Sequence, residues 1–380
     1  MRIGVVAGEA SGDYLGAGLL KSLRENVPGL VAEGIAGPRM QKEGAKSLFP
    51  MTQISLIGVD GLITNLSRLL RIRQKLYRHF IADPPDLFLG IDLPDFNLHL
   101  EKRLRKNGVR TIHYVSPTVW AWRSWRISKI RQAVDHMLVL FPFEEDYFRT
   151  RDIPATFVGH PAADELPEGT TGEIRLRLGL PLEKELVALL PGSRNSEVLN
   201  LGLHFLEAAA LLQRRRAGVE FAVPYVNSEI KQIFRDQLSR VTPNIVLHEF
   251  TGRSTEVMAA SNVVLAASGT AALEAAMLRK PMIVAYKVSR LSYWLARRVA
   301  STPYVSMPNN LVAGPLVPEV LQAAVSGARL CDELWSLLSD SGRSSQMVES
   351  LENIYKQLKN DANTKAAELI LQLRAGWVRP

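Results

Sequence analysis

Residues 3–25 read IGVVAGEASGDYLGAGLLKSLRE and combine an apolar run, a loop of small residues and a segment with helical periodicity. The run Ile3 to Ala7 has the length of one buried strand, and Tyr14 to Glu25 predicts the helix that follows it. A strand that leads through a short loop into a helix is the repeating unit of proteins with parallel sheets. This stretch therefore predicts an α/β fold.

The same alternation continues along the chain and begins a second time after residue 185. In the first half we predict strands at 86–90, 111–115 and 136–140 and a helix at 98–107. In the second half we predict strands at 186–190, 219–223, 245–249, 263–267 and 282–286 and a helix at 196–214. The polar, turn-rich segment DELPEGTTG at 164–172 lies between the halves. Two such arrays indicate two Rossmann-like domains that face a cleft.

The 380 residues exceed what one hydrophobic core usually serves, which also favours two domains. We expect residues 1–165 to form the first domain and residues 166–343 to form the second. Residues 344–380 carry apolar side chains at helical spacing, and such helices need a surface on which to bury that face. We expect them to pack on the first domain, either of the same chain or of a partner in a dimer.

The composition excludes several classes of protein. Hydrophobic residues make up 47% and charged residues 22%, which predicts a packed core rather than disorder. Cys331 is the one cysteine, so an internal disulfide is excluded and a reducing compartment is expected. We find neither a signal-peptide pattern nor an apolar run of about 18 residues, so we expect a soluble or peripheral protein.

The formal charge of +8 allows nucleic acid, an anionic membrane surface or phosphorylated small molecules as partners. No zinc-finger, homeodomain or RNP pattern occurs, so we expect no nucleic-acid partner. The seven histidines are scattered without paired spacing, so we expect no metal site.

The loop GEASGD at 8–13 is the first of three loops in which small residues lie between a strand and a helix. It matches neither G-x-G-x-x-G nor a Walker A loop. Ser11 or Asp13 can cap the following helix. Alternatively, Ser11, Gly12 and Asp13 form a pocket for the phosphate or sugar of a substrate. Both interpretations stay open.

The loop LPGSR at 190–194 also follows a predicted strand. Gly192 allows the backbone to approach a ligand closely, and the amides at the start of the next helix, including that of Ser193, favour an anion. Arg194 adds a planar, charged group suited to phosphate. The alternative is a turn with an exposed arginine.

The third loop lies in ASGTAALE at 267–274. Ser268, Gly269 and Thr270 are small residues at the end of a strand, where open α/β sheets bind ligands. Glu274 lies one turn into the helix and can accept hydrogen bonds from the hydroxyls of a ribose. The alternatives are an N-cap at Ser268 or Thr270 and a Glu favoured by the helix dipole.

The string GIDLPDFN at 90–97 contains two carboxylates three residues apart. Asp92 lies nearer the strand end and is the better candidate for a general base that accepts a proton from a hydroxyl group. Asp95 is expected to cap the following helix. His113 lies in an apolar strand and is expected to be a hydrogen-bonded core histidine. His160 lies near the domain junction and can serve a hinge or the substrate cleft.

Two segments suggest apolar contacts. Residues 119–126, VWAWRSWR, concentrate aromatic and basic residues, and Trp120, Trp122 and Arg123 can form either core or a surface for acyl chains. Between residues 59 and 72 an apolar stripe has helical spacing, and arginines follow closely. Its members are Val59, Leu62, Ile63, Leu66, Leu69 and Leu70. Such a helix either lies on an anionic membrane or packs on its own sheet.

Eight strings of this sequence, taken together, resemble the motifs of the lipid-A-disaccharide synthase family. They are VAGEASGD (6–13), GPRM (37–40), GIDLPDFN (90–97), YVSPTVWAWR (114–123), VGHP (158–161), LPGSR (190–194), ASGTAALE (267–274) and YVSMPN (304–309). They follow the family's order and span most of the chain, down to about Gln322.

The resemblance implies an inverting glycosyltransferase of the GT-B type that needs no metal and no cofactor. The donor would be UDP-2,3-diacylglucosamine and the acceptor 2,3-diacylglucosamine 1-phosphate (lipid X). The product would be the β-1,6-linked disaccharide 1-phosphate of lipid A biosynthesis. It implies Asp92 as base and a UDP site made of the 190–194 and 267–274 strings with Asn309. It also implies a homodimer with exchanged C-terminal parts, located in the cytoplasm at the inner face of the inner membrane.

One segment departs from the family pattern. After Pro308-Asn309 the family commonly has N-(I/L)-L-A-G followed by a charged residue, whereas residues 310–315 here read NLVAGP. Ligand contacts from residues 310–316 are therefore not carried over. The nearest alternative is another GT-B enzyme of the UDP-GlcNAc type, either a lipid-linked GlcNAc transferase or an epimerase. A Rossmann oxidoreductase is disfavoured because G-x-G-x-x-G is missing.

Overall fold

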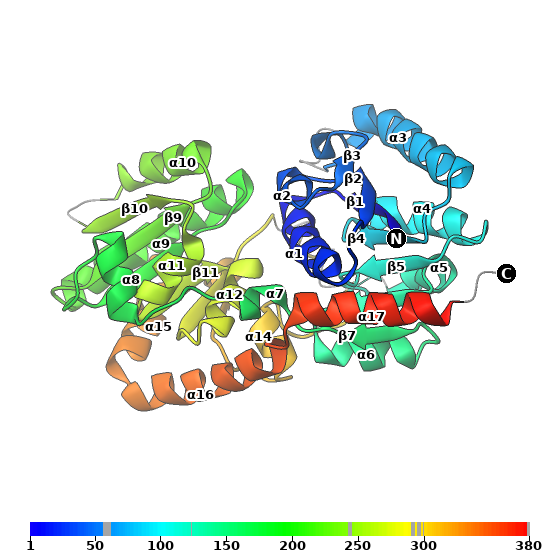
Figure 1. Cartoon of the computed structure of the whole chain (residues 1–380). Helices are drawn as coiled ribbons and strands as arrows, with labels where there is room; N and C mark the ends of the chain where they lie inside the picture. Colours follow the sequence, from blue (N-terminus) through cyan, green and yellow to red (C-terminus); the bar gives the residue numbers. More distant parts are fainter. Residues whose placement is uncertain are drawn as a thin grey trace. The chain divides into compact units, whose positions relative to one another are not determined.

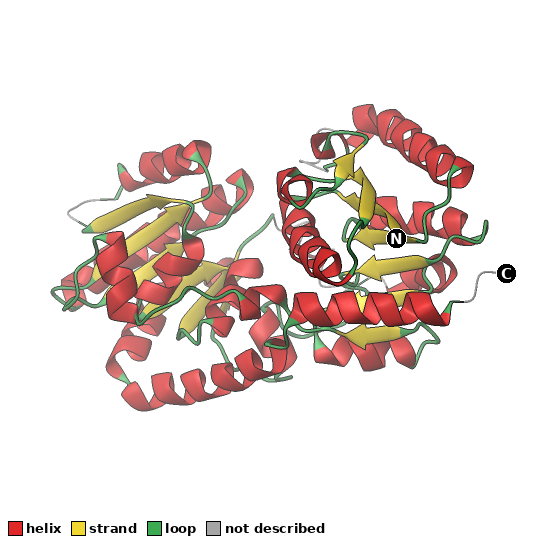
Figure 2. Cartoon of the chain, in the orientation of Figure 1, coloured by secondary structure: helices red, strands yellow, loops and turns green. Residues whose placement is uncertain are grey.

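The computed structural model describes residues 1–55, 62–122, 124–241, 245–289, 293–294, 298 and 300–377, with the backbone alone for residues 62–65. The chain divides into two compact units (Figure 1). Unit 1 holds Met1–Asp164 and Leu358–Pro380, and unit 2 holds Glu165–Gln357. Each unit has one parallel sheet with helices on both of its faces (Figure 2). The predicted α/β fold with two Rossmann-like domains is confirmed.

The sheet of unit 1 has seven parallel strands in the order β3-β2-β1-β4-β5-β6-β7. The strands are β1 (Arg2–Ala7), β2 (Val31–Ile35), β3 (Lys46–Ser47), β4 (Leu87–Ile91), β5 (Thr111–Tyr114), β6 (His136–Val139) and β7 (Ala155–Phe157). The order reverses between β1 and β4, where Ala7 pairs with Ile91. The loops that leave these two strands are therefore neighbours, at the point where open α/β sheets bind ligands.

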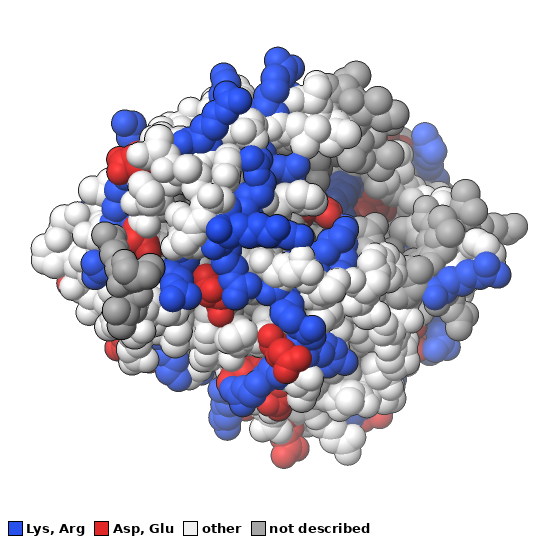
Figure 3. All heavy atoms as spheres, turned by 90° about the vertical axis from the view of Figure 1, so that its right-hand side faces the viewer, with Lys and Arg blue, Asp and Glu red and all other residues white. Residues whose placement is uncertain are grey.

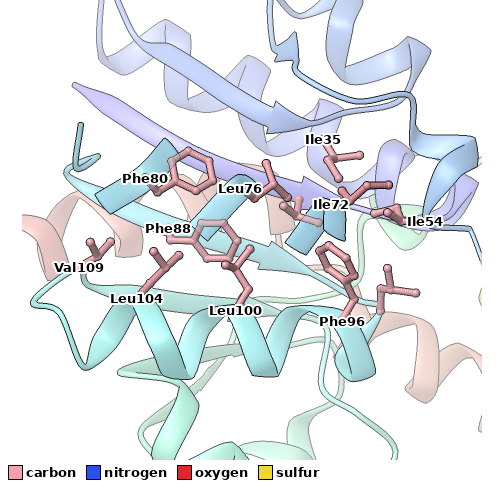
Figure 4. Close-up of a cluster of buried hydrophobic side chains, with 12 residues drawn as sticks. Ile35, Ile54, Ile72, Leu76, Phe80, Phe88, Phe96, Leu100, Leu104 and Val109 are labelled. Atoms are coloured by element: carbon pink, nitrogen blue, oxygen red, sulfur yellow. The ribbon is translucent and has the colours of Figure 1, made fainter. Parts of the chain in front are cut away.

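The helices of unit 1 form two layers. They are α1 (Ala10–Asn26), α2 (Pro38–Lys42), α3 (Leu62–Ala82), α4 (Pro94–Arg105), α5 (Ile127–Ala133), α6 (Pro142–Arg149), α7 (Pro161–Asp164) and α17 (Ala362–Gly376). A buried cluster joins α3 and α4 to the sheet: Leu76 and Phe80 from α3 meet Leu100 from α4 and Phe88 from β4 (Figure 4). This apolar layer supports the first turn of α4, which leads away from the predicted base.

The last helix, α17, packs on α1 of its own chain. Gly18 of α1 faces Asn363 of α17 so closely that a Cβ at residue 18 would lie 2.4 Å from the Asn363 side-chain amide, which would have to move. The turn before α17 is held by Asp164, whose carboxylate accepts hydrogen bonds from the amides of Asn360 (3.1 Å) and Ala362 (2.7 Å).

The sheet of unit 2 has six parallel strands in the order β10-β9-β8-β11-β12-β13, the strand order of the Rossmann fold. The strands are β8 (Leu186–Leu190), β9 (Glu220–Tyr225), β10 (Leu247–Thr251), β11 (Val263–Ala267), β12 (Met282–Tyr286) and β13 (Glu319–Leu321). The helices are α8 (Thr171–Leu178), α9 (Asn195–Arg215), α10 (Ser228–Leu238), α11 (Ser254–Ala260), α12 (Thr270–Met277), α14 (Met307–Leu311), α15 (Gly327–Ser339) and α16 (Ser341–Leu358). Here the order reverses between β8 and β11.

The observed elements differ from the sequence prediction in two places that matter for the site. Helix α4 begins at Pro94 and not near Leu98, because a proline fits the first turn of a helix. The C-terminal segment 344–380 was expected to pack as a whole on the first domain. The structure divides it: α16 lies almost entirely in unit 2, and α17 lies in unit 1. Met347, Leu351 and Ile354 of α16 are buried, so its apolar face is covered.

Candidate active site

The loop that follows β4 has an unusual backbone. Asp92 and Leu93 both adopt positive φ angles, of 50° and 46°, which side-chain-bearing residues rarely do. Each such residue costs on the order of 1 kcal/mol, and strained backbone of this kind gathers at active sites. Asn97 of α4 holds the loop: its Nδ2 donates to the carbonyl of Asp92 at 2.8 Å and contacts those of Val6 and Ile91 at 3.3 Å.

The Asp92 carboxylate is half-buried at the end of β4, and no hydrogen bond or ion pair to it is found among the described residues. Asp95 differs: its carboxylate pairs with Arg126 at 2.6 Å. Asp95 was expected to cap α4, but it lies in the first helical turn, and the N-cap position belongs to Leu93. Of the two carboxylates, Asp92 is the one left free to accept a proton.

Beneath this loop lies a buried pair of polar side chains. His113 of β5 and Glu101 of α4 are both fully buried, with Nδ1 and Oε1 2.7 Å apart. Burial raises the pKa of Glu101, and the neighbouring His113 opposes that rise. Gly90 leaves room for Glu101, since any side chain at residue 90 would clash with its carboxylate. The prediction that His113 is a hydrogen-bonded core residue is confirmed.

The loop after β1 lies beside the Asp92 loop, where Gly8 packs against Leu93. Ser11 is exposed, whereas Gly12 lies against Ile91. Asp13 is buried, and its two carboxylate oxygens accept from the amides of Arg39 (2.9 Å) and Met40 (3.0 Å) at the start of α2. Asp13 therefore neither caps its own helix nor offers its carboxylate to a ligand in this structure. Ser11 does not cap the helix either, because the N-cap position belongs to Glu9, but its side chain is exposed.

The tryptophan segment divides into an anchored and an exposed part. Trp120 donates to Glu144 of α6 at 2.9 Å, and Ser116 donates to the same carboxylate oxygen. Trp122 is exposed and donates to Thr118 at 2.8 Å. Arg123 lies outside the described residues. Burial raises the pKa of Glu144 to about 7, although its hydrogen bonds oppose the rise.

His160 lies after β7, where its backbone amide donates to the carbonyl of Leu358 at 2.9 Å. Its Nδ1 accepts from the amide of Ala162 at 3.3 Å. Burial lowers the pKa of His160 to about 4, so the ring is neutral near pH 7. The residue thus ties together the segments by which the chain leaves and re-enters unit 1.

In unit 2, the backbone amides of the loop after β8 were expected to bind an anion, but a side chain of the protein occupies them. Gly192 has a φ of 130°, which favours glycine. The amides of Ser193 and Arg194 are occupied by the carboxylate of Glu197, at 2.9 and 3.2 Å. The Arg194 side chain is 79% exposed and lies 3.3 Å from Glu197. Its guanidinium group, rather than the amides, remains available to an anion.

The loop after β11 is the neighbour of the β8 loop, because Ala266 pairs with Leu190. Gly269 is the N-cap of α12 with a φ of 150°, and Thr270 is exposed beside it. Ser268 donates to the carbonyl of Val305 at 3.3 Å. Burial raises the pKa of Glu274, and within the described part of the chain its carboxylate has no ion pair. A desolvated, unpaired carboxylate next to a helix start suits a neutral donor such as a ribose hydroxyl.

Asn309 was expected in the nucleotide site, but its side chain is committed elsewhere. Its amide donates to the carbonyl of Val317 (3.0 Å) and to Glu319 (2.8 Å) and accepts from the amide of Val317 (2.8 Å). Glu319 also accepts from Ser306. Asn309 is buried, so in this structure it shapes the loop of residues 304–317 and does not face a ligand.

The apolar stripe of α3 also divides. Leu69 is partly buried against the core and Ile72 is buried in it, so the second half of the helix packs on its own sheet. Leu66 and Leu70 are 53% and 45% exposed. Val59 lies outside the described residues, as do the side chains of Leu62 and Ile63. No described helix is long and apolar enough to cross a membrane, and no metal-binding cluster occurs in the ranges described.

Sequence reasoning missed Asn97 and Glu144, which hold the Asp92 loop and the tryptophan segment. Glu144 is the third residue of α6 and accepts a hydrogen bond from the amide of Phe141 at 3.2 Å. This capping arrangement was the only feature of the local sequence that could have indicated a role for Glu144. Asn97 lies within the GIDLPDFN string, but its three backbone contacts depend on β1 and β4 being neighbours.

The whole chain is similar in fold to several solved structures. The UDP-GlcNAc 2-epimerase of Neisseria meningitidis bound to UDP-GlcNAc matches 99% of this chain and all of its own, with TM-score 0.66 and 12% identity. Anabaena Alr3699/HepE in complex with UDP and glucose matches 98% of this chain and all of its own, with TM-score 0.58 and 12% identity. At this identity the likeness shows the fold, which is that of the GT-B class.

Sequence comparison narrows the class to one family. The family model described as lipid-A-disaccharide synthetase matches residues 3–373. The lipid-A-disaccharide synthase of Pseudomonas aeruginosa strain UCBPP-PA14 is 44% identical over 374 residues, which are 98% of this chain and 98% of the relative. The chain therefore belongs to the lipid-A-disaccharide synthetase family, as its motifs predicted.

Proposed function

We propose that the chain condenses UDP-2,3-diacylglucosamine with 2,3-diacylglucosamine 1-phosphate, giving lipid A disaccharide 1-phosphate and UDP. The family match over residues 3–373 supports this activity. The observation that carries the mechanism is Asp92, a half-buried carboxylate without a partner among the described residues, on a strained loop at the switch point of unit 1.

In the proposed reaction, Asp92 accepts the proton of the acceptor's 6-hydroxyl group as its oxygen attacks the anomeric carbon of the donor. The bond between that carbon and the phosphate oxygen breaks, the electron pair leaves with UDP, and the configuration inverts. A positioned base contributes about 10²- to 10⁴-fold to the rate. Asn97 positions the base by fixing the backbone carbonyl of Asp92.

For the nucleotide we propose the two loops at the switch point of unit 2. Arg194 pairs with the diphosphate, Glu274 accepts from the ribose, and Ser268, Gly269 and Thr270 line the start of α12, while Gly192 and Ser193 allow close approach. Unlike these residues, Asn309 supports the site through Glu319.

For the acceptor we propose the loops of unit 1. Ser11 and Gly12 lie beside the Asp92 loop, and Trp120 and Trp122 offer an apolar surface for the acylated sugar. Arg123 lies outside the described residues and remains a candidate from the sequence. Asp13 and His160 have supporting roles, because Asp13 holds α2 and His160 holds the turn before α17.

We place the enzyme in the cytoplasm, peripheral to the inner face of the inner membrane. Exposed Leu66 and Leu70 on α3 support this placement, together with the exposed basic residues Arg68, Arg71 and Lys75 of the same helix. Figure 3 shows lysine and arginine side chains gathered on the face that carries α3, α4 and α5. We also propose a homodimer, because exchange of α17 between two chains would preserve its contacts with α1.

The decisive test is UDP release from UDP-2,3-diacylglucosamine with and without the acceptor. We expect release to require the acceptor and to yield one disaccharide per UDP. Turnover of a non-acylated UDP-GlcNAc at a comparable rate would instead favour an epimerase or another GlcNAc transferase.

The nucleotide site is tested by calorimetry with UDP. Glu274→Gln and Arg194→Ala should each weaken binding by roughly 1.5–3 kcal/mol, the value of a charge-assisted hydrogen bond. Glu168→Gln is the matched control, because Glu168 is an exposed carboxylate of unit 2 outside the two loops. Unchanged UDP affinity for either variant would remove that residue from the site.

A further inference from the structure

A small cavity lies next to the Asp92 loop, between the start of α4 and the segment that leads into α5. Its volume is about 140 Å³, several times the 30 Å³ or so of one water molecule, which leaves room for a phosphate group. Its lining residues are Pro94, Asp95, Leu98, His99, Lys102, Arg126 and Lys129. Pro94 and Asp95 follow Asp92 almost directly, so the cavity lies at the end of α4 that follows the proposed base.

Positive charge in the cavity is incompletely balanced. Arg126 pairs with Asp95 at 2.6 Å, and Asp95 is the one carboxylate of the lining. Lys102 contacts the neutral Gln132 at 2.6 Å. Lys129 has neither an ion pair nor a hydrogen bond to any described residue. Three cationic side chains against one carboxylate leave two positive charges without a counter-charge.

The surroundings add to this positive field. The pKa of His99 is lowered, first by burial and then by the positive charges of Arg73 and Lys129. The amino end of α4 also points its partial positive charge toward Pro94 and Asp95, which favours an anion there. Gathering like charges in a concavity costs free energy in the unliganded protein. A bound dianion would offset that cost.

We propose that this cavity, lined by Lys102, Arg126 and Lys129, binds the phosphate group of the acceptor sugar phosphate. The inference rests on the proposed function, which supplies an acceptor with a phosphate on C1. With the phosphate held there, the sugar ring extends toward Asp92 and presents its hydroxyl group to the base. The site therefore selects a phosphorylated acceptor over the donor, whose phosphates belong to UDP.

The test compares two acceptors, 2,3-diacylglucosamine 1-phosphate and the same sugar without phosphate, in detergent. For Lys129→Ala and Lys102→Ala we expect KM for the phosphorylated acceptor to rise about 10- to 100-fold, as for one lost charge-assisted hydrogen bond. The kcat value and the affinity for UDP should change little. On the acceptor without phosphate the variants should equal the wild type, and Lys129→Arg should restore most of the affinity.

The matched control is Lys106→Ala, which removes an exposed lysine at the other end of α4, outside the cavity. It should leave KM unchanged for both acceptors. An unchanged KM in both cavity variants overturns the phosphate site while the wild-type activity stands. An equal loss on both acceptors also overturns it. Variants that lose binding to phosphatidylglycerol vesicles but keep KM in detergent would show a membrane contact instead. If the wild-type chain makes no disaccharide, the proposed function itself fails.

Discussion

Asp92 and Leu93 adopt their strained backbone conformation because α4, β1 and β4 over-determine the loop between them. Asn97 reaches back from α4 to three carbonyl oxygens, two of which belong to β4 and its loop and one to β1. The amide of Asp92 also donates to the carbonyl of Tyr114 at 2.9 Å. The carboxylate is therefore presented from a rigid support, as a base must be for proton transfer in a fixed geometry.

Replacing Asp92 with Asn should lower kcat by about 10²- to 10⁴-fold and leave the affinity for UDP nearly unchanged. The amide has the size of the carboxylate but cannot take the proton of the acceptor hydroxyl. Steady-state kinetics and UDP calorimetry measure the two effects. Asp95→Asn is the comparison, since that carboxylate already pairs with Arg126. Near-normal turnover by the Asp92 variant together with a loss in the Asp95 variant would assign the base to Asp95.

Glu144 should make the stability of the protein fall as the pH rises. Its folded-state pKa is raised to about 7 by burial, whereas an unfolded Glu titrates near 4.5. Between pH 4.5 and 7 Glu144 is protonated in the folded state but ionised in the unfolded state. The stability that the protonated Glu144 contributes is therefore fully present below about pH 4.5 and is lost as the pH passes 7. The loss is up to about 3 kcal/mol.

Urea unfolding of the wild type and Glu144→Gln at several pH values between 5 and 7.5 measures this contribution. As the pH rises, the free energy of unfolding of the wild type should fall relative to that of Glu144→Gln. His160, whose low pKa gives the opposite slope, contributes equally to both proteins and cancels. A difference that does not vary with pH would show that Glu144 titrates normally.

At the scale of one element, the two halves of α3 have different environments, one in the core and one exposed. Its second half contributes Ile72, Leu76 and Phe80 to the core (Figure 4). Its first half exposes Leu66 and Leu70. The apolar residues recur along the whole helix in the sequence, but the core of unit 1 covers only those in its second half. The exposed leucines and the neighbouring arginines are the features of a helix that lies at an anionic interface.

The double variant Leu66→Ser, Leu70→Ser should bind anionic vesicles less while its melting temperature stays near that of the wild type. Lipid contact contributes about 0.8 kcal/mol per buried CH₂. The control is Leu76→Ala on the same helix, which should cost about 2–5 kcal/mol in stability because Leu76 is fully buried. A large fall in melting temperature for the double variant would place the two leucines in a protein interface and end the membrane interpretation.

At the scale of the whole molecule, the two ends of the chain are joined in unit 1. Helix α17 closes against α1, and Asp164 holds the turn through which the chain returns. The close packing of Gly18 on Asn363 makes this contact sensitive to a single methyl group.

Gly18→Ala should destabilise the protein although alanine is the better helix former, because its Cβ would displace Asn363 and loosen α17. Gly172→Ala in α8 is the matched control. Nothing lies near its Cβ, so it should be neutral or stabilise by up to about 1 kcal/mol. Thermal melting and limited proteolysis at residues 358–362 measure the effects. Equal stabilisation by both substitutions would show that α17 does not depend on this contact.

Much of the fold was readable from the sequence because buried parallel strands are short apolar runs next to helical patterns. The strands at 3–7, 186–190, 263–267 and 282–286 were predicted closely. Strands β2, β3, β7 and β13 were not, since β3 and β7 are short and β2 contains Glu33 and Gly34. The polar residue Glu33 is tolerated because it pairs with Arg2 in the folded chain.

The α/β class, the family and the loops that carry Asp92, Arg194 and Glu274 follow from the amino-acid sequence, because they depend on local pattern and on motif order. Which polar side chains remain free is known only from the folded structure. Asp13 and Asp95 have the same carboxylate group as Glu274 and Asp92, but groups from distant parts of the chain occupy their carboxylates. The amide of Asn309 is occupied in the same way, by Val317 and Glu319. For Asp13 and Asp95 the hydrogen-bonding partner comes from another element, so the bond forms only with the tertiary structure. Whether a residue supports the fold or faces a ligand is therefore settled when the sheets form.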